Sequence, residues 1–286
     1  MKSNFKKLHV PEGLIVADIS KFTNKINSFR TLGANNLHAI LDFDRTLTVK
    51  RPGSNDEVTT WHIMNEHLPA AAQAQYQQYF TKYRALEVAG KMTNEHAVEW
   101  WTAILDLFVD NHISLTAVER TFLEKASIRP ATNELYDLLN SYKIPSTILS
   151  AGIRDIIDIW SARYGIHPTL TLSTKFEVDS NGIVVGWDKT SLVHVLNKHE
   201  TGHPELTTIK SARPNTLVIV DSLDDAAMAT GDDTVIRVRI LDRRSDDPEL
   251  ATEMARTFEL FDALITTGSM EPLCALVDGI ARPTKK

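Results

Sequence analysis

The chain has 286 residues, enough for about two domains or for one core with a large insertion. It carries 31 basic and 37 acidic residues, and this formal net charge of −6 gives no reason to expect a nucleic-acid polymer as a partner. Its single cysteine, Cys274, excludes an internal disulfide and a cysteine-rich zinc site. No apolar run approaches the ~18 residues of a membrane span, and the N-terminus lacks the apolar stretch of a signal peptide, so we expect a cytoplasmic globular protein.

The first part of the chain predicts one buried strand followed by several helices. Apolar residues at helical spacing predict a helix over 14–32, closed by Gly33, and the apolar run 37–43 predicts a short buried strand. The next stretch contains no convincing strand and predicts consecutive helices over 58–67, 71–88, 94–111 and 116–126. The last of these opens with Thr116-Ala-Val-Glu119, the pattern of a capping box.

From residue 131 onward, short apolar strands alternate with helices. A helix over 132–142, a strand over 145–150 and a helix over 153–164 come first. The segments 170–178 and 182–187 flank Asp179-Ser-Asn-Gly182, which predicts a strand, a turn and a second strand. The remaining elements are expected in the order strand 216–221, helix 223–230, strand 234–240, helix 247–260, strand 263–266 and a helix from Ser269.

This alternation is typical of an α/β fold, a mostly parallel sheet with helices on both faces. The all-helical stretch interrupts the alternation directly after the first strand. We therefore expect an α/β core over 1–48 and 130–286 and a helical cap over 49–129. Trp100 and Trp101 are neighbours on a predicted helix and project about 100° apart, so we expect them in the core of this cap and not on one face of a pocket.

Polar residues follow three of the predicted strands at their carboxyl ends, where open parallel sheets bind ligands. The three segments are Asp42-Phe43-Asp44-Arg45-Thr46, Ser150-Ala151-Gly152 and Asp221-Ser222-Leu223-Asp224-Asp225. Converging carboxylates repel one another unless a cation lies between them, and their hard oxygen atoms favour Mg²⁺. A carboxylate is also ionised at neutral pH, so it can act as a nucleophile without a separate base.

Attack on a phosphate ester has to overcome the repulsion between two anions, and Mg²⁺ and a lysine both offset it by neutralising phosphoryl oxygens. Ser150 and the backbone N–H groups at the following helix start would form an anion cradle, and Gly152 lets the backbone come close to a phosphate. For Asp42 and Asp44 the alternative role is turn formation and helix capping after a strand. For Asp224 and Asp225 it is N-capping of the helix at 223–230.

Seven stretches together resemble one group of enzymes: LDFDRTLT (41–48), KYRALE (82–87), VEWW (98–101), ILSAGI (148–153), NGIVVGW (181–187), LVHVLNKHE (192–200) and VDSLDDAAMATG (220–231). They resemble the haloacid-dehalogenase-like phosphohydrolases and, more narrowly, the cytosolic pyrimidine 5'-nucleotidase family. The resemblance implies a Rossmann-like core with an inserted helical cap. It also implies a Mg²⁺-dependent enzyme that hydrolyses nucleoside monophosphates, pyrimidine preferred, through an aspartyl-phosphate.

The resemblance implies a role for each matching residue. Asp42 would be the nucleophile, Asp44 would protonate the leaving nucleoside oxygen and then activate water, and Lys198 would bridge nucleophile and phosphate. Mg²⁺ would be bound by Asp42, by Asp221 and by the main-chain carbonyl of Asp44, with Asp225 in support. The residues that bind the phosphate and the rest of the substrate would be Ser150, Ala151, Gly152, Thr46 and Glu87, the last of which would contact the nucleoside.

The chain departs from the family's usual residues at three positions. Val220 and Asp224 stand where the family usually has glycine, and Arg45 stands where an uncharged residue is more common. Two alternatives stay open at this point: a phosphatase for another small phosphomonoester, and a catalytically silent nucleotide-binding protein. The sequence does not specify base or sugar preference, or an oligomeric state, and it gives no indication of a membrane partner.

Overall fold

The computed structural model describes residues 10–51, 58–242 and 247–282. A seven-stranded sheet with the order β1-β11-β10-β9-β2-β5-β6 forms its centre. Its strands are β1 (Leu14–Val16), β2 (Leu37–Leu41), β5 (Ser146–Ile153), β6 (Leu170–Thr174), β9 (Asn215–Val220), β10 (Val235–Ile240) and β11 (Ala263–Ile265). Neighbouring strands are parallel except at one edge, where β1 pairs antiparallel with β11. The expected mostly parallel α/β sheet is confirmed.

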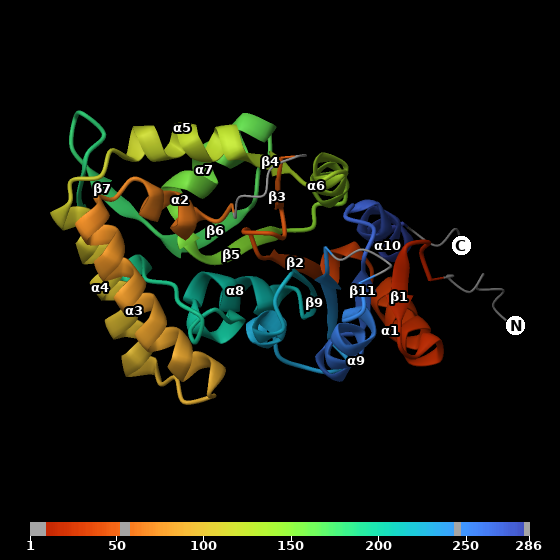
Figure 1. Cartoon of the computed structure of the whole chain (residues 1–286). Helices are drawn as coiled ribbons and strands as arrows, with labels where there is room; N and C mark the ends of the chain where they lie inside the picture. The colour runs from red at the N-terminus through yellow and green to blue at the C-terminus, as the bar shows by residue number, and fades with distance from the viewer. Residues whose placement is uncertain (1–9, 52–57, 243–246, 283–286) are drawn as a thin grey trace, which may run out of the picture.

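Alternate residues of the central strands face opposite sides of this sheet, and helices cover both sides (Figure 1). Ala39 and Leu41 of β2 join an apolar cluster with side chains from α1 (Ile19–Leu32), α6 (Thr132–Ser141), α7 (Arg154–Tyr164) and α10 (Glu271–Ala281). Ile40 points the other way, into a cluster that includes Leu206 of α8 (Pro204–Ala212) and Phe261 at the end of α9 (Leu250–Leu260). Burial on both faces explains why β2 and β9 are nearly continuous apolar runs.

A helical insertion follows β2 and consists of α2 (Thr60–Glu66), α3 (Ala70–Val88), α4 (Asn94–Asp110) and α5 (Leu115–Lys125). The chain enters and leaves it through β3 (Thr48–Lys50) and β4 (Ala126–Ile128), which pair antiparallel. In Figure 1, α3 and α4 lie side by side at the left edge of the molecule. A hairpin of β7 (Phe176–Val178) and β8 (Val184–Trp187) packs against α4, and the indole of Trp187 donates to Asp106 Oδ1 at 2.9 Å.

The predicted helix over 14–32 is wrong at its beginning. Leu14–Val16 form edge strand β1, and α1 begins only at Ile19. Asp18 is the N-cap, and its side chain accepts a hydrogen bond from the backbone N–H of Lys21 at 2.9 Å. The β-branched pair Ile15-Val16 favours a strand and Asp18 marks a helix start, two signals that apolar spacing alone does not separate.

Other elements differ from the predictions at their ends or in their type. Ser114, not Thr116, is the N-cap of α5. The predicted strand 170–178 is divided between β6 of the main sheet and β7 of the hairpin. The predicted helix 223–230 is a short 3₁₀ turn, η4 (Asp224–Met228), and α9 begins at Leu250.

Short elements account for most of what the sequence analysis did not predict. Strands β3 and β4 and helix α8 were not predicted, nor were three further 3₁₀ turns, η1 (Ala34–Asn36), η2 (Lys189–Ser191) and η3 (Glu200–Gly202). Elements of three residues contain too few positions for a periodic apolar pattern to show. In the part of the chain that the structure describes, no helix combines the length and apolar character needed to cross a membrane.

Candidate active site

The site lies at the carboxyl ends of three adjacent strands, β9, β2 and β5. Leu41 of β2 pairs with Ile219 of β9 and with Ile148 of β5, and the backbone N–H of Asp42 extends the ladder by donating to Ile219 at 3.0 Å. The polar segments that follow these strands therefore reach the same edge of the sheet. They line a cavity of about 400 Å³ whose walls include Asp42, Asp44, Ser150, Ala151, Gly152, Lys198, Asp221, Asp224 and Asp225.

Asp42 is buried and is held by a lysine that lies 156 residues further along the chain. Lys198 Nζ lies 2.5 Å from Asp42 Oδ1 and 3.0 Å from Asp225 Oδ2. Thr46 donates its hydroxyl to the other oxygen of Asp42 at 3.2 Å. Burial by itself would lower the pKa of Lys198, but the carboxylates of Asp225 and Asp42 outweigh this effect and raise that pKa above its ordinary value. Lys198 therefore stays charged beside the carboxylates.

Three carboxylates converge around this lysine. Among the described residues, Asp42, Asp221 and Asp225 each offer an oxygen, and these oxygens lie within 4.8 Å of one another. Burial and the charge of Asp42 raise the pKa of Asp221, and burial raises the pKa of Asp225 although Lys198 opposes it. The negative charge is thus incompletely compensated, and a hard divalent cation with oxygen ligands fits such a donor set.

Asp44 lies beside this cluster and is held by the first residue of helix α2. The backbone N–H of Thr60 donates to Asp44 Oδ1 at 3.0 Å, and its hydroxyl donates to Asp44 Oδ2 at 3.0 Å. Burial and the neighbouring charge of Asp42 raise the pKa of Asp44 to about 7. The carboxyl group therefore populates both protonation states near neutral pH, as a group that donates and then accepts a proton needs to do.

The segment Ser150–Gly152 continues β5 past the predicted strand end, with an irregular register between Leu149 and Ile153. The backbone N–H of Gly152 donates to Ser150 Oγ at 3.1 Å, and the carbonyl of Gly152 accepts from Ser173 at 2.7 Å. The carbonyl of Ala151 accepts from two indoles of the helical insertion, Trp61 at 2.9 Å and Trp101 at 3.3 Å. The neighbouring strand β6 and the helical insertion thus both constrain this segment.

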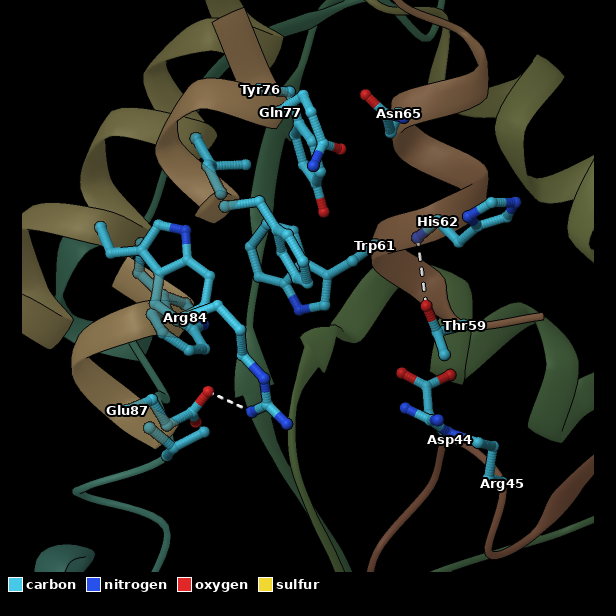
Figure 2. Close-up of a pocket in the computed structure, with 15 residues that line it drawn as sticks. Asp44, Arg45, Thr59, Trp61, His62, Asn65, Tyr76, Gln77, Arg84 and Glu87 are labelled. Carbon is cyan, nitrogen blue, oxygen red and sulfur yellow. Dashed lines mark hydrogen bonds and ion pairs between the residues drawn. The ribbon is translucent and has the colours of Figure 1, made fainter. Parts of the chain in front are cut away.

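A second cavity, of about 580 Å³, adjoins the first and extends between the helices of the insertion. Figure 2 shows Glu87 and Arg84 of α3 on one side of it, and Asp44, Arg45 and α2 on the other. Glu87 forms an ion pair with Arg84 and lies on the wall of both cavities. Aromatic side chains supply much of the remaining wall: Trp61, Tyr76, Phe80, Trp100 and Trp101.

Trp100 and Trp101 are both buried in the insertion, as expected, and both also line the larger cavity. Their rings pack edge to face with centroids 4.8 Å apart.

The three positions that depart from the family's usual residues are accommodated in different ways. Val220 is fully buried and ends β9. Asp224 is exposed and, like Asp225, does not cap a helix, because Leu223 is the N-cap of η4. Arg45 has a φ of 62° and places its Nε 3.7 Å from Asp221 Oδ2.

Several residues of the site were not predicted from the sequence. Thr60, Trp61 and Arg84 lie on helices of the insertion, where nothing in their spacing indicates a contact with strand-end residues. Thr60 could have been found only indirectly, because the N-cap Thr59 places it at a helix start.

Comparison with known proteins assigns the chain to a family. The family model described as pyrimidine 5'-nucleotidase (UMPH-1) matches residues 45–281. The chain is 29% identical over 258 residues to the 7-methylguanosine phosphate-specific 5'-nucleotidase A of Xenopus laevis, with 86% of each protein covered. It is 24% identical over 272 residues to the 7-methylguanosine phosphate-specific 5'-nucleotidase of Gallus gallus, with 90% of this chain and 91% of the relative covered.

Solved structures share the fold. Cytosolic 5'-nucleotidase IIIB bound to cytidine superposes with a TM-score of 0.76 at 21% identity, covering 96% of this chain and 97% of the other. A substrate-bound phosphoserine phosphatase superposes with a TM-score of 0.53 at 14% identity, covering 84% and 96%. Because the family model matches most of this chain, the chain belongs to the pyrimidine 5'-nucleotidase (UMPH-1) family and is a phosphoric monoester hydrolase.

Proposed function

We propose that this protein is a Mg²⁺-dependent 5'-nucleotidase that acts through a phosphorylated Asp42. The observation that carries the proposal is the placement of Asp42, buried against Lys198 and within the carboxylate cluster, next to an Asp44 whose pKa is raised to about 7. Mg²⁺ would be held by the carboxylates of Asp42 and Asp221 and by the main-chain carbonyl of Asp44, with Asp225 in support. The ion, when bound, supplies positive charge that neutralises phosphoryl oxygens.

In the first step, an oxygen of Asp42 attacks the phosphorus atom and the bond from phosphorus to the 5'-oxygen breaks. Protonated Asp44 gives its proton to that oxygen, and the nucleoside leaves. Lys198 offsets the repulsion between the attacking carboxylate and the phosphate, while Ser150 and the backbone N–H of Ala151 hold phosphoryl oxygens. Thr46, proposed from the sequence to bind the phosphate, is buried and donates its hydroxyl to Asp42, so it would hold the nucleophile in place.

In the second step, water attacks the phosphorus of the aspartyl-phosphate, and the bond from phosphorus to the Asp42 oxygen breaks. The Asp44 carboxylate accepts the proton from that water, inorganic phosphate is released and Asp42 is regenerated. The raised pKa of Asp44 suits both steps, because its two protonation states are close in free energy near neutral pH.

The proposed substrate is a nucleoside monophosphate, and the presence of two adjoining cavities supports it. The phosphate would occupy the smaller cavity, and the nucleoside would extend into the larger one, between α2, α3 and α4. Glu87 lies on the walls of both and would contact the nucleoside. The helical insertion, with proposed bounds 49–129, would act as the cap that excludes water from the acyl-phosphate. A relative from Caenorhabditis elegans named putative cytosolic 5'-nucleotidase 3 supports action in the cytosol.

We propose pyrimidine nucleotides as the preferred substrates, in line with the name of the family model. The larger cavity also favours a second candidate, 7-methylguanosine monophosphate. Its wall combines aromatic rings with the carboxylate of Glu87, and aromatic faces with a nearby negative charge bind methylated cationic groups. The names of the Xenopus and Gallus relatives support this candidate.

The test measures phosphate release from UMP, CMP, 7-methylguanosine monophosphate and a small phosphate ester without a nucleobase, each with Mg²⁺ and with EDTA. We expect Mg²⁺-dependent release from nucleotides, and we expect Asp42→Asn to reduce it by at least about 10³-fold, because an amide cannot attack phosphorus. Asp106→Asn is the matched control, since Asp106 accepts a hydrogen bond from Trp187 of the hairpin and lines neither cavity.

Each outcome of this test has a defined meaning. Turnover by Asp42→Asn close to that of the wild type would overturn the nucleophile assignment. Release only from the ester without a base would favour a phosphatase for another small phosphomonoester. Nucleotide binding without any release would favour a silent binding protein.

A further inference from the structure

Arg129 is a buried arginine at the junction between the helical insertion and the core. It follows β4, through which the chain leaves the insertion, and it is 1% exposed. Arginine is rarely buried unless its donors are all used. The contacts of Arg129 therefore indicate what it holds in place.

One side of Arg129 holds three consecutive carbonyl groups that directly follow Asp44. Its backbone N–H donates to Leu47 at 2.9 Å, its Nε donates to Thr46 at 2.6 Å, and its Nη2 donates to Arg45. These three residues form the loop that connects the two aspartates at the end of β2 to strand β3.

The other side of Arg129 is fixed to the core. Its Nη1 and Nη2 donate to the two carboxylate oxygens of Asp242, at 2.7 and 2.8 Å, in a bidentate pair. Its Nη1 also lies 3.4 Å from the carbonyl of Gly268, beyond β11. The rigid guanidinium thus joins the loop after β2 to the ends of β10 and β11.

The loop needs such support because its conformation is strained and it carries a contact to the nucleophile. Arg45 adopts a φ of 62°, in the left-handed region that disfavours residues with a side chain. The next residue, Thr46, donates its hydroxyl to Asp42 at 3.2 Å. Charge-assisted hydrogen bonds to the carbonyls of Arg45 and Thr46 hold both residues in these positions.

We propose that Arg129 is a positioning residue that sets the geometry of Asp42 and Asp44 by holding carbonyls 45 to 47, with Asp242 as its anchor. This inference rests on the proposed function, in which those two aspartates perform the chemistry. Arg129 does not line either cavity and so acts through the loop, without touching substrate.

The test compares Arg129→Lys with the wild type in steady-state hydrolysis of a nucleoside monophosphate. Lysine keeps the charge but offers donors from one atom, so it cannot span Arg45, Thr46 and Asp242 at once. We expect kcat to fall about 10²-fold while KM changes less than about threefold, because the nucleoside cavity stays intact and the reacting groups shift. Asp242→Asn should give a smaller loss of kcat, since Arg129 retains its three carbonyl contacts.

A second readout does not depend on turnover. Beryllium trifluoride with Mg²⁺ mimics a phosphoryl group on an aspartate, and its binding should raise the melting temperature of the wild type. We expect Arg129→Lys to lose most of that rise. The matched control is Lys25→Met, which removes another buried ion pair, 2.5 Å from Lys25 Nζ to Asp262 Oδ1 and away from both cavities. It should lower the melting temperature but keep both the ligand-induced rise and the wild-type kcat.

These measurements separate the two proposals. A wild type that releases no phosphate from any nucleotide would overturn the proposed function. In that case the melting experiment would still test the positioning role of Arg129. An Arg129→Lys variant with wild-type kcat and a full ligand-induced rise would overturn the positioning role. The positioning role would also be overturned if Lys25→Met lost as much kcat and as much of the ligand-induced rise as Arg129→Lys.

Discussion

At Gly152 the segment Ser150–Gly152, the helical insertion and Asp44, the proposed acid, lie close together. A Cβ at this position would lie 2.5 Å from Thr60 Oγ1, 3.1 Å from Ser150 Oγ and 3.2 Å from Asp44 Oδ2. The distance to Thr60 is far below van der Waals contact, so that hydroxyl would have to move. Because the same hydroxyl donates to Asp44, the displacement would reach the proposed proton donor.

We therefore expect Gly152→Ala to lower kcat/KM for nucleotide hydrolysis by about 10²-fold, since small misplacements of reacting groups have effects of this size. The matched control is Gly165→Ala at the end of α7. Gly165 has a φ of 68° and open space around it, so alanine there should cost about 1 to 2 kcal/mol of stability through backbone strain alone. Steady-state kinetics and urea denaturation of both variants would check this, and equal activity of the two would contradict it.

At the scale of elements, two helices of the insertion contact the segment Ser150–Gly152, which we propose binds the phosphate, through a single carbonyl. Trp61 of α2 and Trp101 of α4 both donate to Ala151, and both line the larger cavity. Trp100 lines the same cavity, but its indole nitrogen is buried and has no hydrogen-bond partner among the described residues. These three tryptophans therefore separate the effect of the hydrogen bonds from the effect of lining the cavity.

The double variant Trp61→Phe, Trp101→Phe should reduce kcat/KM by about 30-fold, because it removes two hydrogen bonds of about 1 kcal/mol each. Trp100→Phe should have less than about a threefold effect, although it also removes an indole from the wall. The measurement is nucleotide hydrolysis by each variant. A Trp100→Phe variant as impaired as the double variant would show that the hydrogen bonds to Ala151 are unimportant.

Some of the strands and site residues could be predicted from the sequence, and others could not. The long apolar strands and the order of the acidic segments were predicted correctly, because burial on both faces of β2 and β9 leaves an apolar run that ends abruptly at a carboxylate. The candidate site residues were named on the same basis and by resemblance. In contrast, β1 was merged into a helix, and Thr60 and Arg129 were not identified. Their positions depend on contacts between distant segments, which leave no local pattern.

For the whole molecule, the buried carboxylates couple protonation to stability. The folded-state pKa values of Asp44, Asp221 and Asp225 are raised above the ordinary value of 3.8, chiefly by burial, and that of Asp44 reaches about 7. A group with a raised carboxyl pKa binds protons more tightly in the folded state than in the unfolded state. Its contribution to stability is therefore complete below the unfolded-state pKa and is lost as the pH rises through the folded-state pKa.

We accordingly expect the metal-free protein to lose stability between about pH 4 and pH 7 through these groups. At the proposed metal site Mg²⁺ would compete with protons for these carboxylates, so it should raise the melting temperature more at pH 8 than at pH 5.5. Thermal melts with Mg²⁺ and with EDTA at the two pH values would measure the difference, and Asp221→Asn should diminish it. An equal rise at both pH values would contradict the coupling.

The order of strands in the sheet also has a consequence for biosynthesis. Strand β2 is fully buried between β5 and β9, yet β9 ends at Val220, whereas β2 ends at Leu41. At typical rates of translation, the ribosome needs about 10 to 40 s to add the residues between them. During that interval the insertion can fold from local contacts, while the apolar strand that carries Asp42 has no partner on one edge. We therefore expect the nascent chain to be prone to misassociation at β2 during this interval, because an unpaired apolar strand edge can pair with other chains.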